Sequence, residues 1–424
     1  MKTKLKQIYY DMRHQPVIAW VTFFATAMSV FLIMVIIMMQ NVKSAPFAPE
    51  SCRDRLLLGV NLHVEDIEDQ DINSSSSLSS VAARVLYDDI DGVEKISYYH
   101  KWMDDSEVSV PGGESCMAQL RKADATFFNI FDYTLIEGRY YTTEEADALM
   151  PLAVITETVA RNVLGDAPWT GRDIVIDDRQ YTVVGVVRDI SSLAMTAYAD
   201  LFVPTALSDT EGDRDNLLGQ FGAVMVVKEG VDFSHIRQQV KARYSTLDAM
   251  LAQSGMRAVY HEGPYDQEVI SNDDLYSNVT PDLTSAKRMH LIIYAILLLV
   301  PAVNLSSMLH SRLSRRIREI GIRRAFGCTR KRIIADVIIE NFIVTLLGGA
   351  VGVVTGVIFA ATYSGLYNDY ENFRYGDTPV MGALLNWQTV GVALLVCFIL
   401  NIFSAALPAW YASSLKPVEA LNSK

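Results

Sequence analysis

The residues with the clearest capacity for chemistry in this sequence are basic. Nine arginine and lysine side chains lie between Arg312 and Arg332, and Glu319 is the single acid among them. This run carries a net charge of +8, although the whole chain of 424 residues has a formal net charge of −12. Such a concentration of cations attracts acidic protein surfaces and anionic lipid headgroups. The run is therefore a candidate binding surface rather than a catalytic centre.

The basic run also has a helical pattern. Spacings of three and four residues place Ile317, Ile320 and Arg324 on one face and Arg316, Glu319 and Arg323 on another. Gly321 and Gly327 interrupt the pattern, which favours a short helix, a turn and a second helix. Two interpretations remain: a lipid-facing loop that fixes membrane orientation, or a surface helix that contacts a cytoplasmic partner.

Other side chains with a capacity for chemistry are sparse. His63, Glu65 and Asp66 occur in "HVED", and three ligand types in one predicted strand without a second cluster indicate a solvated edge rather than a metal site. The "YHEG" around His261 lacks the second histidine of a zinc-binding helix. No grouping typical of a nucleophilic triad stands out, so we predict no catalytic residue and no bound metal.

The chain also lacks a nucleotide-binding motif. No G-x-x-x-x-G-K-[ST] occurs, and the glycine-rich "GGAVGVVTG" has no lysine. Its Gly348, Gly352 and Gly356 recur every four residues, the spacing that lets two transmembrane helix backbones approach closely. We expect these glycines to pack helices.

Two carboxylates and two cysteines complete the candidates. Asp336 and Glu340 lie about three and two helical turns before Gly348, near the nine basic residues. A carboxylate at mid-bilayer costs about 2.5–3.5 kcal/mol, so we expect both at the membrane interface, where they anchor the basic loop. Cys52 and Cys116 both lie before the second apolar stretch, on the side predicted to be outside the cytoplasm. An oxidising compartment there would permit a disulfide, and the sequence alone does not decide whether one forms.

Long apolar stretches must position these residues. Half of the residues are apolar and the mean hydropathy is +0.18, values typical of a chain that is partly embedded in lipid. Four stretches have the length of about 20 residues that a spanning helix needs: Val17 to Met39, Leu291 to Leu309, Phe342 to Ala361 and Val390 to Leu407. A cleaved signal peptide is the alternative for the first stretch, but its apolar core is too long.

Charge predicts how these stretches are oriented. The first sixteen residues carry a net charge of +3, whereas residues 41–288 contain 21 basic and 41 acidic residues. Because short flanks rich in Lys and Arg stay cytoplasmic, both termini should lie on the cytoplasmic side of the membrane. The predicted order is a cytoplasmic amphipathic segment (1–16), a span (17–40), an extracytoplasmic domain (41–288), a span (289–310), a cytoplasmic basic loop (311–332), a span (333–362), a short outer loop (363–388), a span (389–410) and a cytoplasmic tail (411–424).

The sequence of the extracytoplasmic domain predicts an α+β fold of about two lobes. Residues 182–187 form a β-branched run preceded by a turn signal, and residues 80–89 have the caps and spacing of a helix. A strand at 224–227 precedes an amphipathic helix at 233–247. The segment 61–80 contains "EDIEDQDINSSSS", which indicates a mobile acidic insert.

The basic run and the chain's last residues resemble one family. "RRIREIGIRRAFGCTRKRIIADVIIENFIVTLLGGAVGVVTG" is similar to the cytoplasmic loop and third transmembrane helix of the MacB/FtsX-type permeases of ABC transporters. The residues that fill the family's pattern are Arg316, Glu319, Ile320, Gly321, Ile322, Arg323, Arg324, Ala325, Gly327 and Glu340. "LPAWYASSLKPVEALNSK" resembles the family's ending, and "DATFFNIFDYTLIEGRYYTTEEA" resembles its periplasmic domain.

The resemblance implies a non-catalytic permease subunit in the cell inner membrane. Its loop would couple to separate ABC ATPase subunits, which bind ATP and Mg, while this chain binds no cofactor. A second permease copy, in a homodimer or heterodimer, membrane lipid and a periplasmic adaptor or substrate protein are the other implied partners, with no nucleic acid. The implied activity is efflux of peptides or drugs, or lipoprotein extraction, by mechanotransmission. The alternatives are an ATPase-driven regulator of a periplasmic protein such as a cell-wall hydrolase, and a membrane-anchored sensing or binding protein without an ATPase.

Overall fold

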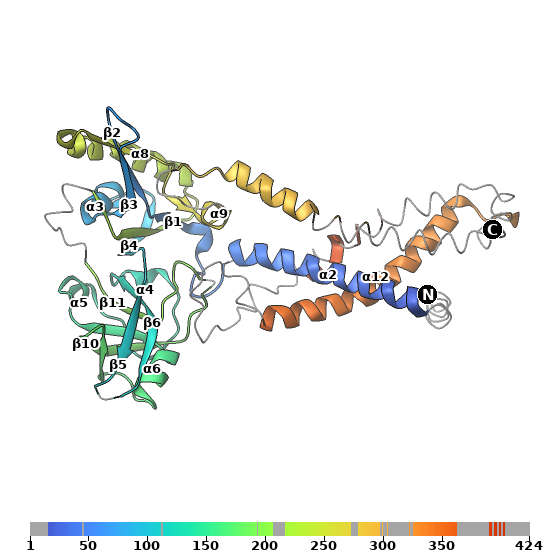
Figure 1. Ribbon diagram of the computed structural model, residues 1–424, viewed down its shortest axis with the longest axis horizontal. Helices are drawn as coiled ribbons and strands as arrows, with labels where there is room; N and C mark the ends of the chain where they lie inside the picture. Colours follow the sequence, from blue (N-terminus) through green and yellow to red (C-terminus); the bar gives the residue numbers. More distant parts are fainter. Residues whose placement is uncertain are drawn as a thin grey trace. The chain divides into compact units, whose positions relative to one another are not determined.

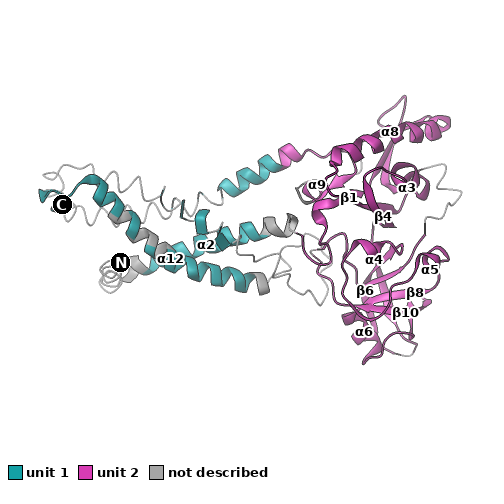
Figure 2. Ribbon diagram, turned by 180° about the vertical axis from the view of Figure 1, so that it is seen from behind, with its two compact units in different colours: residues 1–42, 287–364, 381–424 teal, residues 43–286, 365–380 magenta. Residues whose placement is uncertain are grey.

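The computed structural model describes most of the chain. The described residues are 16–44, 46–111, 113–192, 194–206, 217–272, 279–296, 299, 303, 322, 325–362, 390–391, 394–396, 398–399 and 402. They belong to two compact units, which Figure 2 distinguishes by colour. One unit comprises Met1–Val42, Lys287–Ser364 and Met381–Lys424, and the other comprises Lys43–Ala286 and Gly365–Val380.

The first unit is helical where it is described. Helix α2 (Pro16–Ser44) covers the predicted span 17–40, and α12 (Arg330–Thr362) covers the predicted span 333–362 (Figure 1). Residues 283–296 are also helical. Within the described residues, no helix combines the length and apolarity that crossing a membrane requires. The count of four spans stays a prediction. The predicted segments 1–15, 363–388 and 411–424, and most of 389–410, lie outside the described residues.

The second unit is an α+β domain, as predicted, built on a 15-stranded sheet. Its strands are β1 (Leu56–Gly59), β2 (Leu62–Asp66), β3 (Asn73–Leu78), β4 (Val93–His100), β5 (Asp104–Ser109), β6 (Ser115–Ala123), β7 (Leu135–Gly138), β8 (Leu152–Thr156), β9 (Asp173–Ile176), β10 (Arg179–Val187), β11 (Leu201–Pro204), β12 (Leu218–Gly219), β13 (Phe221–Val227), β14 (Met256–Val259) and β15 (Tyr265–Asp266). Its helices are η1 (Arg53–Arg55), α3 (Ser80–Tyr87), α4 (Phe127–Ile130), α5 (Thr143–Asp147), α6 (Glu157–Leu164), α8 (Phe233–Leu251), η2 (Ala252–Ser254) and α9 (Gln267–Asn272).

Two separate hydrophobic cores divide this domain into lobes. The first lobe is built on the core of β1, β2, β13, α3 and α8, which includes Leu57, Leu86 and Val240. The second lobe is built on the core of β5, β6, β8, β10, β11 and α6, which includes Ile155 and Val186. Because each core buries its own apolar surface, each lobe has an independent source of stability.

A short pairing joins the two lobes within the sheet. Along the sheet the strands follow the order β11-β8-β10-β9-β5-β6-β4-β13-β3-β2-β14. Strand β6 of the second lobe pairs with β4 of the first lobe at one register position, Tyr99 opposite Ala123. Asp124 reinforces this lobe junction by accepting hydrogen bonds from Ser97 Oγ at 2.7 Å and from Tyr98 N at 2.7 Å.

Local sequence explains the helices that cover the first lobe. The Ser79 side chain caps α3 by accepting a hydrogen bond from Ala82 N at 3.1 Å. The Asp232 side chain caps α8, which buries Ile236, Val240, Leu247 and Leu251 at spacings of four and seven residues. The helices predicted at 80–89 and 233–247 are therefore confirmed, with small differences at their ends.

The predicted strand at 182–187 is also confirmed as part of β10. It pairs with β9 in an antiparallel hairpin whose turn holds Asp177 and Asp178 at φ 44° and 65°. Aspartate tolerates this left-handed region better than most residues, which explains the turn signal in the sequence.

The prediction of a mobile acidic insert is wrong for the serine run. Ser74 to Ser77 lie in β3, which pairs with β2 on one side, while Ser77 also pairs with Gly219 of β12. Ser77 is 1% exposed. The ladder satisfies the backbone groups of these residues, and small side chains fit between neighbouring strands. Low hydrophobicity therefore does not prevent a strand here.

Candidate functional site: the coupling turn and the glycine seam

The end of the basic run forms a turn that leads directly into α12. We call residues 325–329 the coupling turn. The amide of Phe326 donates to Ile322 O at 3.1 Å, which closes the last helical turn before it. Gly327 has φ +88°, a left-handed conformation that commonly ends a helix. The carbonyl of Thr329 accepts from Arg332 N and Ile333 N, and α12 begins at Arg330. A helical segment, a turn and a second helix were the predicted order.

The coupling turn displays an apolar ring among cations. The Phe326 side chain is 89% exposed, the highest value among the exposed large hydrophobic residues of the described chain. Arg330, Lys331 and Arg332 at the start of α12 are also exposed. An exposed aromatic residue that is followed in sequence by exposed cations is typical of an interface anchor. The sequence prediction assigned no role to Phe326, although an aromatic residue inside a basic run was a usable signal.

Several predicted coupling residues cannot be placed. Of the predicted set, Ala325 and Gly327 lie in the coupling turn, whereas Arg316, Glu319, Ile320, Gly321, Arg323 and Arg324 lie outside the described residues. Asp336 and Glu340 lie on the first turns of α12, and the described part of the structure does not include their side chains. Their predicted roles at the membrane interface remain predictions.

The three glycines of α12 lie against α2 and form what we call the glycine seam. A Cβ atom on Gly352 would lie 2.6 Å from the carbonyl oxygen of Ala27 and 2.7 Å from Val30 Cβ. A Cβ on Gly348 would lie 3.1 Å from Thr26 Cβ, and one on Gly356 would lie 3.3 Å from Met34 Cβ. Glycine is therefore required for the two helix backbones to approach this closely.

Neighbouring side chains extend the glycine seam. The rings of Phe31 and Phe359 meet edge to face with centroids 5.4 Å apart, an arrangement that aromatic pairs favour. Ser29 is 4% exposed and donates its hydroxyl to Ala25 O at 2.7 Å, so it adds no unpaired polar group to the contact. Helices α2 and α12 are therefore in close atomic contact along the seam.

The two extracytoplasmic cysteines are not bridged. Cys52 and Cys116 are both free. The Cys52 thiol donates to Ile130 O at 3.6 Å, whereas Cys116 lies on β6 opposite Val108 of β5. The disulfide that the sequence left open is absent. Burial raises the pKa of both thiols, which lowers their reactivity as nucleophiles.

Two histidines from distant parts of the sequence meet in the first lobe. The rings of His63 and His261 have centroids 5.3 Å apart. His63 contacts Ser75 Oγ through Nδ1 at 2.5 Å and lies 3.6 Å from a carboxylate oxygen of Glu65. His63 is 6% exposed, so the prediction that it lies at a solvated edge is wrong. Strand β2 is polar in sequence, but β3 and β14 pair with its two edges, so it is an interior strand of the sheet.

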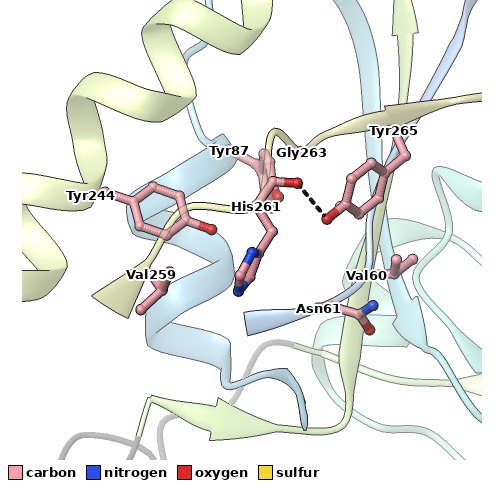
Figure 3. Close-up of a pocket in the computed structure, with 9 residues that line it drawn as sticks. Val60, Asn61, Tyr87, Tyr244, Val259, His261, Gly263 and Tyr265 are labelled. Atoms are coloured by element: carbon pink, nitrogen blue, oxygen red, sulfur yellow. Dashed lines mark hydrogen bonds between the residues drawn. The ribbon is translucent and has the colours of Figure 1, made fainter. Parts of the chain in front are cut away.

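His261 also lines a pocket in the first lobe. Figure 3 shows its ring in the space between Tyr244, Val259 and Asn61. Its Nδ1 lies 2.8 Å from Thr280 Oγ1, while its Nε2 is buried and has no hydrogen-bond partner among the described residues. Burial, assisted by His63, lowers the pKa of His261. In the described residues, no group of three or more His, Cys, Asp or Glu side chains is arranged to hold a metal ion.

These features define a class of protein. An α+β domain is inserted between two helices, and a turn with an exposed aromatic ring continues into a helix packed on the first one. This is the organisation of a protein with a large α+β domain inserted into an apolar helical unit.

Comparison with known families identifies the class more closely. Residues 21–243 match the MacB-like periplasmic core domain, and residues 291–417 match the FtsX-like permease C-terminal domain. The first match covers more than half of the chain. The chain therefore belongs to the MacB/FtsX-type permeases of ABC transporters.

Individual relatives are distant. The chain is 23% identical over 296 residues to the uncharacterized ABC transporter permease YknZ of Bacillus subtilis, covering 70% of this chain and 68% of that protein. It is 25% identical over 356 residues to the macrolide export ATP-binding/permease protein MacB of Wolinella succinogenes, covering 83% of this chain but only 51% of that protein. The crystal structure of the periplasmic region of MacB from Actinobacillus actinomycetemcomitans is 14% identical, with a TM-score of 0.34, and the match covers 50% of this chain and 90% of that one.

Proposed function

We propose that this chain is the permease subunit of an ABC transporter that converts ATP hydrolysis by a separate ATPase subunit into movement of its periplasmic domain. The coupling turn is the observation that carries this proposal. Phe326 is 89% exposed beside three exposed cations, and the helix that follows is packed on α2 through the glycine seam. A force on the turn would therefore be transmitted through α12 to α2, the helix that leads to the periplasmic domain.

The partners follow from the surface chemistry. Phe326 of the coupling turn, with the exposed Arg330, Lys331 and Arg332 after it, fits an acidic, apolar-centred surface of an ATPase subunit, which would hold ATP and Mg. The chain itself has no G-x-x-x-x-G-K-[ST] motif. A second permease copy, as homodimer or heterodimer, and a periplasmic adaptor or substrate protein complete the proposed assembly, in the cell inner membrane with both termini cytoplasmic.

For the transported or regulated molecule we propose only a chemical class. Curated relatives carry the names macrolide export and pyoverdine export proteins. With a formal charge of −20 between residues 41 and 288, this periplasmic domain favours neutral or cationic cargo such as peptides over anionic cargo. We therefore propose efflux or extraction of such a cargo from the periplasm, by mechanotransmission.

Recovery of the ATPase tests the proposed function. The full chain is purified from its native host in mild detergent, and co-purified nucleotide hydrolase is quantified. Phe326→Asp should lower this recovery about thirtyfold, because an interface anchor contributes about 2 kcal/mol and each 1.4 kcal/mol is a factor of ten. Trp102→Asp is the matched control, because Trp102 is 63% exposed on the periplasmic domain.

The outcomes separate the alternatives. Wild-type protein that never brings down a nucleotide hydrolase would reject the proposal and support a membrane-anchored sensing protein. Equal recovery with Phe326→Asp and wild type would reject the coupling turn as the docking surface. Glu319→Lys or Gly321→Pro in the same loop should also abolish ATPase recovery while leaving membrane insertion intact.

A further inference from the structure

The segment that joins α2 to β1 contains a buried ion pair. We call residues 46–55 the strap. Glu50 is 1% exposed and Arg53 is 2% exposed, and Arg53 Nε lies 2.5 Å from Glu50 Oε2. The Arg53 guanidinium also lies over the ring of Phe47, 4.2 Å from its centroid. Burial of two charges is costly unless their remaining hydrogen-bonding groups are satisfied, so the surroundings of this pair must supply partners.

Those partners come from the second lobe. The other carboxylate oxygen of Glu50, Oε1, accepts hydrogen bonds from Thr196 N at 2.8 Å and from Ala197 N at 2.9 Å. The carbonyl of Pro49 accepts from Asp132 N at 2.9 Å. The Cys52 thiol donates to Ile130 O. All four contacts reach two segments, 130–132 and 196–197, that flank the second-lobe strands β7 and β11.

The chain then passes from the strap into the first lobe. Strand β1 directly follows the strap, and it pairs with β13 over four residues, from Leu56 opposite Val226 to Gly59 opposite Ala223. The buried contacts of the strap therefore fasten the chain that follows α2 to the second lobe, and Arg55 at the end of the strap also pairs with Glu94 of β4 in the first lobe at 3.3 Å.

The other end of the domain leaves from the first lobe alone in the described contacts. Strand β15 pairs with β1, and α9 follows it. His261 contacts Thr280 at 2.8 Å, and Asp282 caps the helix of residues 283–296 by accepting from Ser285 N at 2.9 Å. The chain that enters the domain thus has buried contacts with the second lobe before β1, whereas the chain that leaves it contacts the first lobe through β15 and His261.

We propose that the strap is a pulling point, which rests on the proposed function: it fastens α2 to the second lobe, so that displacement of α2 relative to helix 283–296 opens or closes the lobe junction. The junction suits this use because β4 and β6 pair at one position, Tyr99 opposite Ala123. A short pairing between two independently packed lobes bends at lower cost than either core.

Hydrogen exchange on the full chain, with its ATPase in nanodiscs, tests the strap. Glu50→Ala removes the acceptor of Thr196 N and Ala197 N. Glu137→Ala is the matched control, because the Glu137 carboxylate accepts from Trp169 N at 3.0 Å and Thr170 N at 2.9 Å within the same lobe without touching the strap. Without nucleotide, Glu50→Ala should speed exchange at 196–197 about tenfold, and Glu137→Ala should speed it at 169–170 instead.

A second measurement adds ATP and orthovanadate. Wild type should change exchange at least twofold at residues 97–100 and 120–124, which form the lobe junction. Glu137→Ala should keep this nucleotide response, and Glu50→Ala should lose it while ATP hydrolysis stays within twofold of wild type. That last combination separates transmission from a purely stabilising role of the buried pair.

Each other result overturns the strap proposal. A nucleotide response that survives in Glu50→Ala means that force reaches the junction by another route. Loss in both variants means that lobe stability alone decides the response, and no response in wild type means that the junction does not move. If no ATPase co-purifies, the proposed function fails by itself, and unchanged exchange at 196–197 in Glu50→Ala still rejects the fastening independently.

Discussion

The glycine seam and the lobe junction are both contacts between two parts of the chain, and they are built in opposite ways. In the glycine seam, glycines replace larger residues, so the helix backbones come close enough that a Cβ on Gly352 would lie 2.6 Å from a carbonyl oxygen. In the lobe junction, the strands meet at one pairing, and the Asp124 carboxylate supplies directed hydrogen bonds.

This difference teaches where the molecule is stiff and where it bends. Close packing tolerates neither insertion nor separation, because every contact is lost at once when the helices part. The junction has one strand pairing, a few hydrogen bonds and the Tyr99 ring packed on Phe127 at a centroid distance of 5.6 Å, so we expect it to open locally while each core stays intact. The seam is suited to transmit displacement, and the junction is suited to absorb it.

The largest expected effect sharpens the description of the junction. Asp124→Ala removes the acceptor of the Tyr98 amide at 2.7 Å and the side-chain acceptor of the Phe127 amide at 3.1 Å. The Phe127 amide keeps only the longer bond to Asp124 O at 3.3 Å. Each unsatisfied donor costs about 1–3 kcal/mol, so we expect a loss of about 3 kcal/mol in unfolding free energy of the periplasmic domain. Thermal unfolding followed by circular dichroism, with hydrogen exchange at these two amides, measures it.

The exposed helix cap Asp232 provides the control for that prediction. Asp232→Ala removes the acceptor of Ser234 N at the start of α8 and should cost about 1 kcal/mol. If Asp124→Ala destabilised the domain no more than Asp232→Ala, the junction would not depend on its hydrogen bonds.

The next effect tests the seam. Gly352→Ala adds a Cβ 2.6 Å from Ala27 O and 2.7 Å from Val30 Cβ. Overpacking costs about 1–3 kcal/mol, so we expect about 2 kcal/mol less stability in detergent, measured by thermal aggregation of the full chain. Gly391→Ala is the same chemical change at a helical glycine with nothing within 4 Å of the new Cβ, and it should be neutral or slightly stabilising. Equal effects of both substitutions would contradict close packing at the seam.

A smaller effect concerns pH and lies in the first lobe, outside both the glycine seam and the lobe junction. Burial lowers the pKa of His261, so the folded protein resists protonation that the unfolded chain accepts near pH 6.5. This contribution to stability is present above pH 6.5 and is lost as pH falls from there towards the lower folded pKa. The groups that face His261 are His63 and Glu65, so the titration belongs to the cluster.

We expect the periplasmic domain to lose less than about 1 kcal/mol through this cluster between pH 7.5 and 5.5. His261→Gln should reduce the pH dependence of the thermal midpoint, whereas His235→Gln at an exposed site should leave it unchanged. A wild-type midpoint that rises on acidification would reverse the predicted sign.

Local sequence patterns predicted the elements with strong periodicity. The spacing of apolar residues from Phe233 onward and the β-branched run at 182–187 both became the expected helix and strand. Both patterns depend on neighbours within a few residues, so burial and local propensity indicate the same structure. The four-residue glycine period likewise indicated close packing, because its physical cause lies in the helix itself.

Contacts between distant residues were not predictable in the same way. The serine strand β3 is stabilised by pairing with β2 and β12, which its own composition does not reveal. His63 and His261 meet only because β14 pairs with β2. The carboxylate of Glu50 accepts hydrogen bonds from the backbone amides of Thr196 and Ala197, and no sequence motif predicts that contact. Each depends on the topology of the sheet rather than on spacing along the chain.

The smallest effect lies in the second lobe, away from both the seam and the junction. Hydrogen bonds from Arg139 lower the pKa of Glu145 to about 2, and Glu145 also completes the capping box of α5 with Thr142. Because the folded pKa is depressed, the stabilisation is present above the unfolded pKa of about 4.3 and is lost as pH falls towards 2. The pair is largely solvated, so the expected contribution is below about 1 kcal/mol.

Hydrogen exchange of the α5 amides at pH 4.5 and pH 2.5 measures this effect, after correction for the intrinsic pH dependence of exchange. Wild type should lose protection of Ala146 and Ala148 on acidification, whereas Glu145→Gln should already have low protection at pH 4.5 and change little. Glu114→Gln, an exposed residue outside the capping box, should behave as wild type. If protection at Tyr98 in the lobe junction fell in parallel with α5, the junction would not open independently of the second lobe, and its contrast with the glycine seam would lose its physical basis.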